Sequence, residues 1–206
     1  MNSAAGGRRT DMTDLVDLEP AAARVTRLLR DLPDDRLDAP TPADIPVADL
    51  LAHLVMLSEA FRVAATKEAD VGPPPDEPPA LDPRWRALLP QRLERLVAAW
   101  RQPDAQEGET SAGGLRMPAA EAAVVALDEL VLHGWDLARA TGQPYEPDPR
   151  DVATVLAFTE SFGSPEGTPG LFGPAVPVPD DAPAFDRALG FSGRDPAWRA
   201  PAPTGH

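Results

Sequence analysis

The spacing of apolar residues along the chain predicts long amphipathic helices. Within residues 11–31, apolar side chains recur every three or four positions, which is the period of one face of an α-helix. These side chains are Leu15, Leu18, Ala22, Val25, Leu28 and Leu29. The same spacing predicts helices over 47–69 and 84–101. No segment shows the two-residue alternation of a half-buried strand with any strength, so the pattern predicts an all-α fold.

Helix start and stop signals bound these elements. Asp44 and Pro46 are expected to cap and begin the second helix, and the proline-rich segment 71–83 ends it, because proline cannot continue a helix. A fourth helix is predicted over 118–141, where a proline suits the first turn and Gly142 marks the exit. Four long helices joined in this way are typical of an antiparallel four-helix bundle.

The remaining segments are shorter or irregular. Residues 102–117 are polar and contain glycines, so we expect a loop there. A further helix is predicted over 149–162, and a short one over 184–189. Between them, segment 163–183 is so rich in glycine and proline that we expect an extended chain that wraps the bundle.

The length of 206 residues favours one domain, because two halves would each be small and marginal. We expect residues 1–10 to be a disordered tail and residues 11–145 to form the bundle. Residues 146–206 are expected to be a C-terminal extension that packs on it.

Charge and composition narrow the possible partners. The formal net charge is −14 and no cluster of Lys and Arg is present, which argues against binding to nucleic acid. No apolar stretch is long enough to span a membrane, and no secretory signal is evident, so we expect a soluble, cytoplasmic protein. The chain has no cysteine and three histidines, so a metal would have to be held by His, Asp and Glu.

A glutamate and a histidine interrupt the apolar face of the fourth predicted helix. Val125, Glu129, His133 and Leu137 follow at four-residue intervals and therefore share one stripe. Burial of an unpaired carboxylate costs several kcal/mol, and no Lys or Arg on the stripe is placed to pair with Glu129. A divalent metal would compensate that charge. The alternative is a buried Glu129–His133 ion pair or hydrogen bond without metal.

His53 is the third candidate ligand. It shares the apolar face of the second predicted helix with Leu50 and Leu57. Alone, a histidine there is more often a hydrogen-bonded core residue than a ligand. Together with Glu129 and His133 it would complete a three-ligand site with an open coordination position, for which zinc is the best candidate.

Three further side chains are candidates for a role near this site. Asp136 could accept a hydrogen bond from the second ring nitrogen of a ligand histidine, or it could be a solvated or capping carboxylate. Arg116 and Arg139 could meet an anionic substrate, although surface arginines are usually only solvated.

The sequence resembles a known family at these positions. ELVLHGWDLARATG at 129–142 and DLLAHL at 49–54 are similar to actinobacterial metal-binding proteins related to the N-terminal domain of mycothiol-dependent maleylpyruvate isomerase, in the DinB/YfiT-like superfamily. The C-terminal part resembles a subgroup of about 200 residues through FGP at 172–174, VPVP at 176–179 and GRDP at 193–196.

The resemblance implies a four-helix bundle with zinc held by His53, Glu129 and His133. It also implies a small thiol, mycothiol, as cosubstrate for isomerase or S-transferase chemistry on a small electrophilic molecule. Isomerase activity itself is not expected, because the isomerase has an additional C-terminal domain for which we expect this chain to have no room. The alternative function is a non-catalytic metal-binding bundle with a structural, sensor or partner-binding role, and the sequence leaves the choice between the two open.

Overall fold

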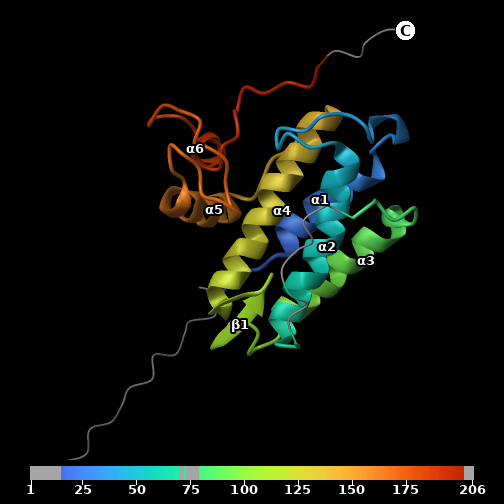
Figure 1. Cartoon of the computed structure of the whole chain (residues 1–206), viewed down its shortest axis with the longest axis vertical. Helices are drawn as coiled ribbons and strands as arrows, with labels where there is room; N and C mark the ends of the chain where they lie inside the picture. The colour runs from blue at the N-terminus through green and yellow to red at the C-terminus, as the bar shows by residue number, and fades with distance from the viewer. Residues whose placement is uncertain (1–14, 70–71, 73–78, 202–206) are drawn as a thin grey trace, which may run out of the picture.

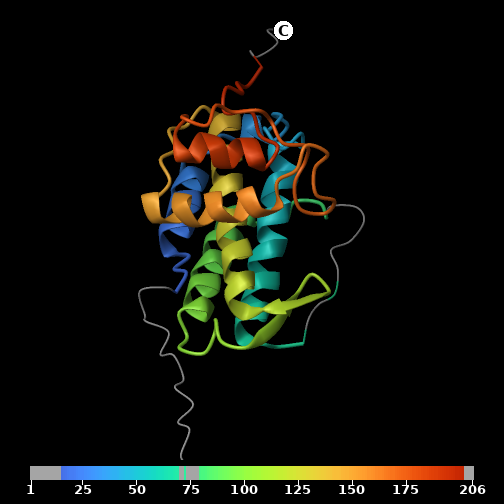
Figure 2. The same ribbon diagram turned by 90° about the vertical axis from the view of Figure 1, so that its left-hand side faces the viewer.

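Four helices form the main body of the molecule. The structure is a computed structural model that describes residues 15–69, 72 and 79–201. Its main helices are α1 (Glu19–Arg30), α2 (Val47–Thr66), α3 (Trp85–Trp100) and α4 (Ala119–Thr141). They lie side by side, and α1 and α2 each pack against both α3 and α4 (Figures 1 and 2). The predicted predominance of helices is therefore confirmed.

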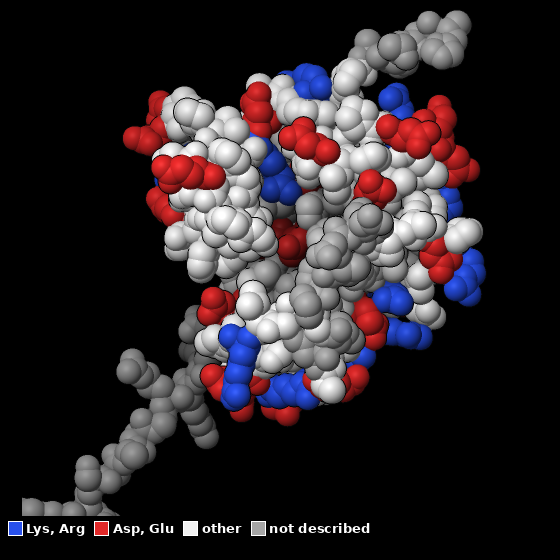
Figure 3. Space-filling model, in the orientation of Figure 1, with Lys and Arg blue, Asp and Glu red and all other residues white. Residues whose placement is uncertain are grey.

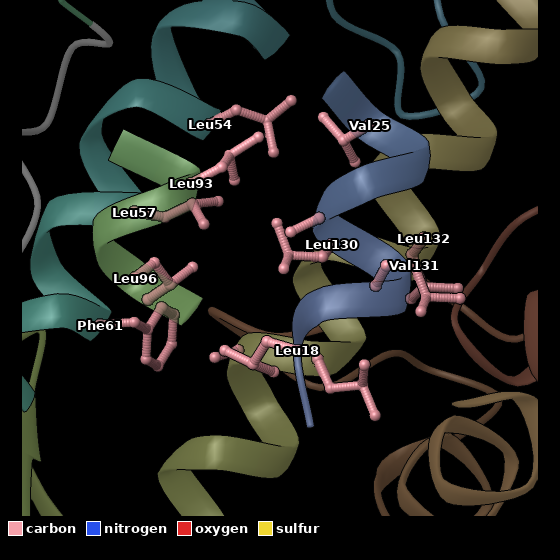
Figure 4. Close-up of a cluster of buried hydrophobic side chains, with 14 of the residues drawn as sticks. Leu18, Val25, Leu54, Leu57, Phe61, Leu93, Leu96, Leu130, Val131 and Leu132 are labelled. Atoms are coloured by element: carbon pink, nitrogen blue, oxygen red, sulfur yellow. The ribbon is translucent and has the colours of Figure 1, made fainter. Parts of the chain in front are cut away.

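The apolar faces of these helices meet in one core. Leu54 and Phe61 of α2, Leu93 of α3 and Leu130 of α4 all point into it, as Figure 4 shows. Val25 of α1 closes the core from the opposite side and is fully buried. The stripes that the sequence pattern identified are thus the buried faces, and burial of such side chains is the main source of stability in the fold.

Two expectations at helix starts were wrong. Leu15 was placed on the buried face of the first helix, but α1 begins only at Glu19 and Leu15 is 42% exposed. Asp44 was expected to cap the second helix, but Pro46 occupies the cap position and the backbone of Asp44 adopts a φ of 59°. Asp is one of the few residues other than glycine that tolerates this left-handed conformation, which here belongs to a tight turn closed by Thr41 and Ile45.

The segment 102–117 contains a β-hairpin, where only a loop was expected. β1 (Glu109–Ala112) pairs antiparallel with β2 (Leu115–Pro118), with Ala112 opposite Leu115. Gly113 and Gly114 form the turn, both with positive φ, and this requirement is the reason that Gly-Gly favours two-residue hairpins. The strands are four residues long and carry almost no apolar alternation, so their sequence signal was weak.

The C-terminal part lies against α4. α5 (Pro149–Phe162) and α6 (Ala184–Phe191) pack against each other, and α5 crosses α4 (Figure 2). The intervening residues 163–183 form neither helix nor a regular strand, as predicted. Residues 1–14, which include the predicted tail, lie outside the described residues. A short 3-10 helix, Asp34–Arg36, follows α1. None of the helices among the described residues is long and apolar enough to cross a membrane.

Candidate metal centre

The structure brings His53, Glu129 and His133 together. His53 lies on α2, and the other two lie one turn apart on α4, which packs against α2. One potential ligand atom from each residue lies within 4.8 Å of the other two. Among residues 15–69, 72 and 79–201 this is the one such group of three or more His, Cys, Asp or Glu side chains. The spatial grouping was predicted from the sequence, and the role of these residues as metal ligands stays a prediction.

Glu129 is the centre of the group. Its Oε2 lies 3.0 Å from His133 Nε2 and 3.3 Å from His53 Nε2. The two imidazole rings meet edge to face, with their centroids 5.0 Å apart. Ligand atoms about 2.0–2.1 Å from a tetrahedral zinc are separated by about 3.3 Å, so the His53–Glu129 distance matches a zinc ligand set, and both distances also match hydrogen bonds.

Exposure decreases from one side of the group to the other. The side chains of His53, Glu129 and His133 are 34%, 24% and 13% exposed, respectively. The group therefore opens toward solvent past His53 and is closed behind His133. No fourth His, Cys, Asp or Glu among the described residues joins it, so a metal ion held by these three side chains would keep a coordination position for another ligand.

Asp136 holds the second ring nitrogen of His133. Its Oδ2 lies 2.9 Å from His133 Nδ1, and the carboxylate is fully buried. Of the two interpretations of Asp136, the partner of a candidate ligand is confirmed, and the solvated or capping carboxylate is wrong. Such a hydrogen bond fixes the tautomer and orientation of a metal-binding histidine.

Arg194 completes this arrangement and was not among the candidate site residues. Its Nε donates to Asp136 Oδ1 at 2.9 Å, and its Nη2 donates to Asp136 Oδ2 at 2.8 Å. The residue is only 8% exposed. The sequence signal that could have found it is the GRDP segment at 193–196, but nothing in the sequence connects that segment to α4, 58 residues earlier.

The hydrogen-bond geometry favours a proton or a metal ion between His133 Nε2 and Glu129. Asp136 is ionised because it pairs with Arg194, so His133 Nδ1 must carry the proton that it donates. A neutral imidazole would then direct the lone pair of Nε2 at the Glu129 carboxylate, 3.0 Å away. Either a proton or a metal ion relieves that repulsion. Burial lowers the pKa of His133, but hydrogen bonds with Asp136 and Glu129 outweigh it and raise the pKa to about 9.

The charge of Glu129 is compensated by protein groups even without metal. Burial raises the pKa of Glu129, but hydrogen bonds with His133 and His53 outweigh this effect and lower the pKa well below its usual value. The Glu129–His133 ion pair, which the sequence left open as the alternative to a metal, is therefore present in the structure. A protonated His133, and not a Lys or Arg of the same helix, supplies the positive charge.

A pocket of about 350 Å³ lies over the two histidines. Its walls come from three separate segments: Pro42 to Ile45, Leu171 to Gly173, and Ser192 to Arg194. Figure 3 shows a hollow between the lobe that carries α5 and α6 and the other helices, with acidic atoms at its base and basic atoms at its edge. A small molecule can therefore reach the candidate ligands from solvent.

Neither of the two arginines considered as substrate contacts lines this pocket. Arg116 pairs with Glu109 on the hairpin, and both side chains are exposed. Arg139 donates to the carbonyl of Pro196 at 3.1 Å and lies over the ring of Trp135. Both contacts are those of structural or solvated arginines.

Comparison with known proteins identifies the family. The family described as "Mycothiol maleylpyruvate isomerase N-terminal domain" matches residues 18–138. Two strains of Mycobacterium tuberculosis, CDC 1551 / Oshkosh and H37Rv, have similar proteins, named "Uncharacterized protein MT0763" and "Uncharacterized protein Rv0738". Each is 30% identical over 198 residues, which cover 89% of this chain and 98% of the relative.

The fold is similar to that of solved structures of mycothiol-dependent maleylpyruvate isomerase. The TM-score is 0.66 for the enzyme at 19% identity, and 0.66 for a histidine-to-alanine variant of it at 17% identity. Both matches cover 94% of this chain and 93% of the solved chain. The expectation that this chain has no room for the C-terminal part of the isomerase was therefore wrong, because α5, α6 and the segment between them extend the similarity beyond the four main helices. The chain belongs to the mycothiol maleylpyruvate isomerase N-terminal domain family.

Proposed function

We propose that this protein binds one divalent metal ion, with zinc as the best fit, and uses it to activate a small thiol for attack on an electrophilic molecule. One observation carries the proposal. Nitrogen and oxygen atoms of His53, Glu129 and His133 lie within 4.8 Å of one another, and the two histidines line a pocket that is open to solvent. In the same proposal, α1 to α4 are the four-helix bundle of the DinB/YfiT-like superfamily, which is supported by their pairwise packing.

The donor set suits zinc. Two imidazoles and one carboxylate are typical of catalytic zinc sites, which keep one position for water or substrate. The hydrogen bond from His133 Nδ1 to Asp136 leaves Nε2 free to act as a ligand. Without cysteine in the chain, soft metals such as Cu(I) lack their preferred thiolate ligands.

The open position and the pocket support a thiol as cosubstrate. When bound, a zinc ion would lower the pKa of a thiol that coordinates it and so supply a thiolate at neutral pH. The chain's own residues would hold the metal through His53, Glu129 and His133 and orient the thiol against the pocket walls. A volume of about 350 Å³ lies within the range of small-molecule sites. Mycothiol is the first candidate, since the family description and the solved relatives name it.

The reaction class that we propose is transfer of the thiol to a small electrophile. When the thiol adds to an activated double bond, its sulfur bonds to one carbon and its proton ends on the neighbouring carbon. No other reactant is needed. We place the protein in the cytoplasm, where low-molecular-weight thiols are abundant.

Metal content is the first test. Protein purified without a histidine tag should contain close to one zinc per chain, and His53→Ala or His133→Ala should remove most of it, because two ligands rarely hold zinc tightly. The matched control is His206→Ala, which removes the third histidine of the sequence, a residue outside the described part of the chain. We expect the control to retain its metal. Wild-type protein that stays free of metal when saturating zinc is supplied would overturn the proposal.

A panel of thiols tests the reaction. The zinc-loaded protein should accelerate addition of mycothiol to a generic electrophile more than addition of glutathione, and His133→Ala should abolish the acceleration. Cobalt substitution checks the open position, since a thiol that coordinates the metal changes its visible spectrum. Metal binding with uncatalysed rates for every thiol would instead favour the non-catalytic metal-binding function.

A further inference from the structure

The turn that carries Arg194 is built to place this residue. The backbone N–H of Arg194 donates to Leu189 O at 2.8 Å and closes the end of α6. Gly193 has a φ of 82°, and a Cβ there would lie 3.1 Å from the backbone of Gly173. A residue with a side chain would therefore strain the backbone and push the two segments apart. The turn is fixed against the Gly173 segment, and the position of Arg194 is fixed with it.

The guanidinium of Arg194 grips Asp136 with two parallel hydrogen bonds. Its Nε and Nη2 lie 2.9 and 2.8 Å from Asp136 Oδ1 and Oδ2, respectively. Its Nη1 lies 3.2 Å from the hydroxyl of Ser192, so the third nitrogen also has a partner. A bidentate arginine fixes both the plane and the ionisation of a carboxylate, which a lysine cannot do to the same degree.

The same oxygen of Asp136 links Arg194 to the metal centre. Asp136 Oδ2 accepts from Arg194 Nη2 and also lies 2.9 Å from His133 Nδ1. An ionised carboxylate can only accept, so it selects the form of His133 with the proton on Nδ1. Nε2 is then directed at Glu129, 3.0 Å away.

We infer that Arg194 is a positioning residue: it holds Asp136 so that His133 presents Nε2 to the metal centre. The inference deepens the proposed function, because it rests on His133 as a ligand. It means that the C-terminal turn after α6, which is remote in sequence from α2 and α4, is part of the metal centre.

Nuclear magnetic resonance tests the inference with or without metal. In ¹⁵N-labelled wild type, the His133 Nδ1–H should give a slowly exchanging proton signal, and Arg194→Met should abolish it in chelator as well as in zinc. Arg187→Met is the matched control, because Arg187 lies on α6 and pairs with Glu160 at 3.7 Å, outside this network. The control should keep the signal.

Zinc affinity provides the second measurement. Loss of the hydrogen-bond partner of a metal-binding histidine typically lowers metal affinity 10–100-fold. We expect Arg194→Met and Asp136→Asn each to lower zinc affinity by roughly this factor. Arg194→Lys should restore part of the loss. The double variant Asp136→Asn, Arg194→Met should bind zinc no more weakly than Asp136→Asn alone, because Arg194 acts through Asp136. This double variant also avoids an unpaired buried charge and so keeps the test open if a single variant fails to fold.

The outcomes separate the inference from the proposed function. If Arg194→Met lowers only the free energy of unfolding and leaves both the His133 signal and zinc affinity unchanged, Arg194 is merely structural and the inference is wrong. Additive losses in the double variant would also overturn it. If wild type binds no zinc, the proposed function fails, while the His133 signal in chelator still decides the role of Arg194.

Discussion

Two buried carboxylates on neighbouring helices behave in opposite ways. Asp136 on α4 is fully buried, yet its pKa is lowered: burial raises it, but the charge of Arg194 and the hydrogen bond with His133 outweigh that effect. Asp151, in the first turn of α5, is 6% exposed, and its Oδ2 has no hydrogen-bond partner. Burial, followed by the nearby charge of Asp148, raises the pKa of Asp151 to about 6.

The difference shows that partners, not burial alone, decide whether a buried acid is charged. A carboxylate that is gripped by an arginine keeps its charge and can orient a histidine, as Asp136 does. A carboxylate without such a partner gives up its charge more readily and costs stability at neutral pH. Glu129 of the candidate metal centre has two histidines instead of an arginine as partners, and its pKa is likewise lowered because hydrogen bonds with His133 and His53 outweigh burial.

Removal of the charge of Asp136 should have the largest effect on the free energy of unfolding. Asp136→Asn leaves the Arg194 guanidinium buried without an anionic partner, and we expect a loss of about 3–5 kcal/mol in the free energy of unfolding. Denaturant unfolding in chelator measures it. The double variant Asp136→Asn, Arg194→Met should recover part of the loss. A loss well under about 1 kcal/mol would show that the guanidinium is solvated through the pocket.

Glu129 should be stabilising even without metal. It accepts from His133 and His53, so Glu129→Gln in chelator at pH 7 should lower the free energy of unfolding by about 1–3 kcal/mol. Glu121→Gln, at an exposed position in the first turn of α4, is the control and should change little. A Glu129→Gln protein that is more stable than wild type in chelator would mean that the carboxylate depends on metal for compensation.

Replacement of Asp151 should stabilise the protein, whereas replacement of Asp136 or Glu129 should destabilise it. The effect at Asp151 should also depend on pH. Because its pKa in the folded state is raised from 3.8 to about 6, the folded protein binds more protons over this interval and loses stability as pH rises through it. Asp151→Asn should therefore stabilise the protein by about 1–2 kcal/mol above pH 6 and have little effect near pH 4. The positive end of α5 favours the charged form by only about 0.3–1 kcal/mol, so the effect of burial is larger.

Thermal or denaturant unfolding at both pH values checks this prediction. Glu160→Gln, an exposed position on the same helix, is the control for the loss of one negative charge. Equal effects of Asp151→Asn at pH 4 and pH 8 would show that the Asp151 carboxyl is not the titrating group.

Loss of an exposed ion pair should have the smallest effect on the free energy of unfolding. Arg116 and Glu109 pair across the hairpin with side chains that are 74% and 58% exposed. Glu109→Gln should change the free energy of unfolding by less than about 1 kcal/mol, and less still at high salt. A salt titration of the two proteins measures the difference. A large, salt-independent loss would contradict the view that solvent already screens this pair.

Local sequence signals predicted the helices well where capping residues and periodicity agreed. α5 was predicted over about 149–162 and has these bounds in the structure, where Asp148 caps the helix and Pro149 begins it. α2 was predicted to run to residue 69, but Lys67 adopts a φ of 56° and α2 ends at Thr66. The hairpin after α3 was missed, because its main signal, Gly113-Gly114, lies between strands too short to show a pattern.

The candidate metal centre was predictable only in part. His53, Glu129 and His133 stood out because polar residues interrupted two apolar faces, and periodicity reveals such interruptions. Two interpretations of Asp136 stayed open, because a residue three positions after a candidate ligand can contact that ligand or can face solvent. Arg194 gave no such signal, because its partner lies 58 residues away and its segment has no periodic structure.

The sequence by itself therefore indicated most of the helices, their buried faces and each of the three candidate ligands, because each of these features depends on residues within a few turns of the same helix. Tertiary structure decided which charges meet. It placed Arg194 against Asp136, set Asp44 and Gly173 in the walls of a pocket, and gave Glu129 two histidine partners. Charge compensation acts over a few ångströms in space, so it is fixed only when segments remote in sequence pack together.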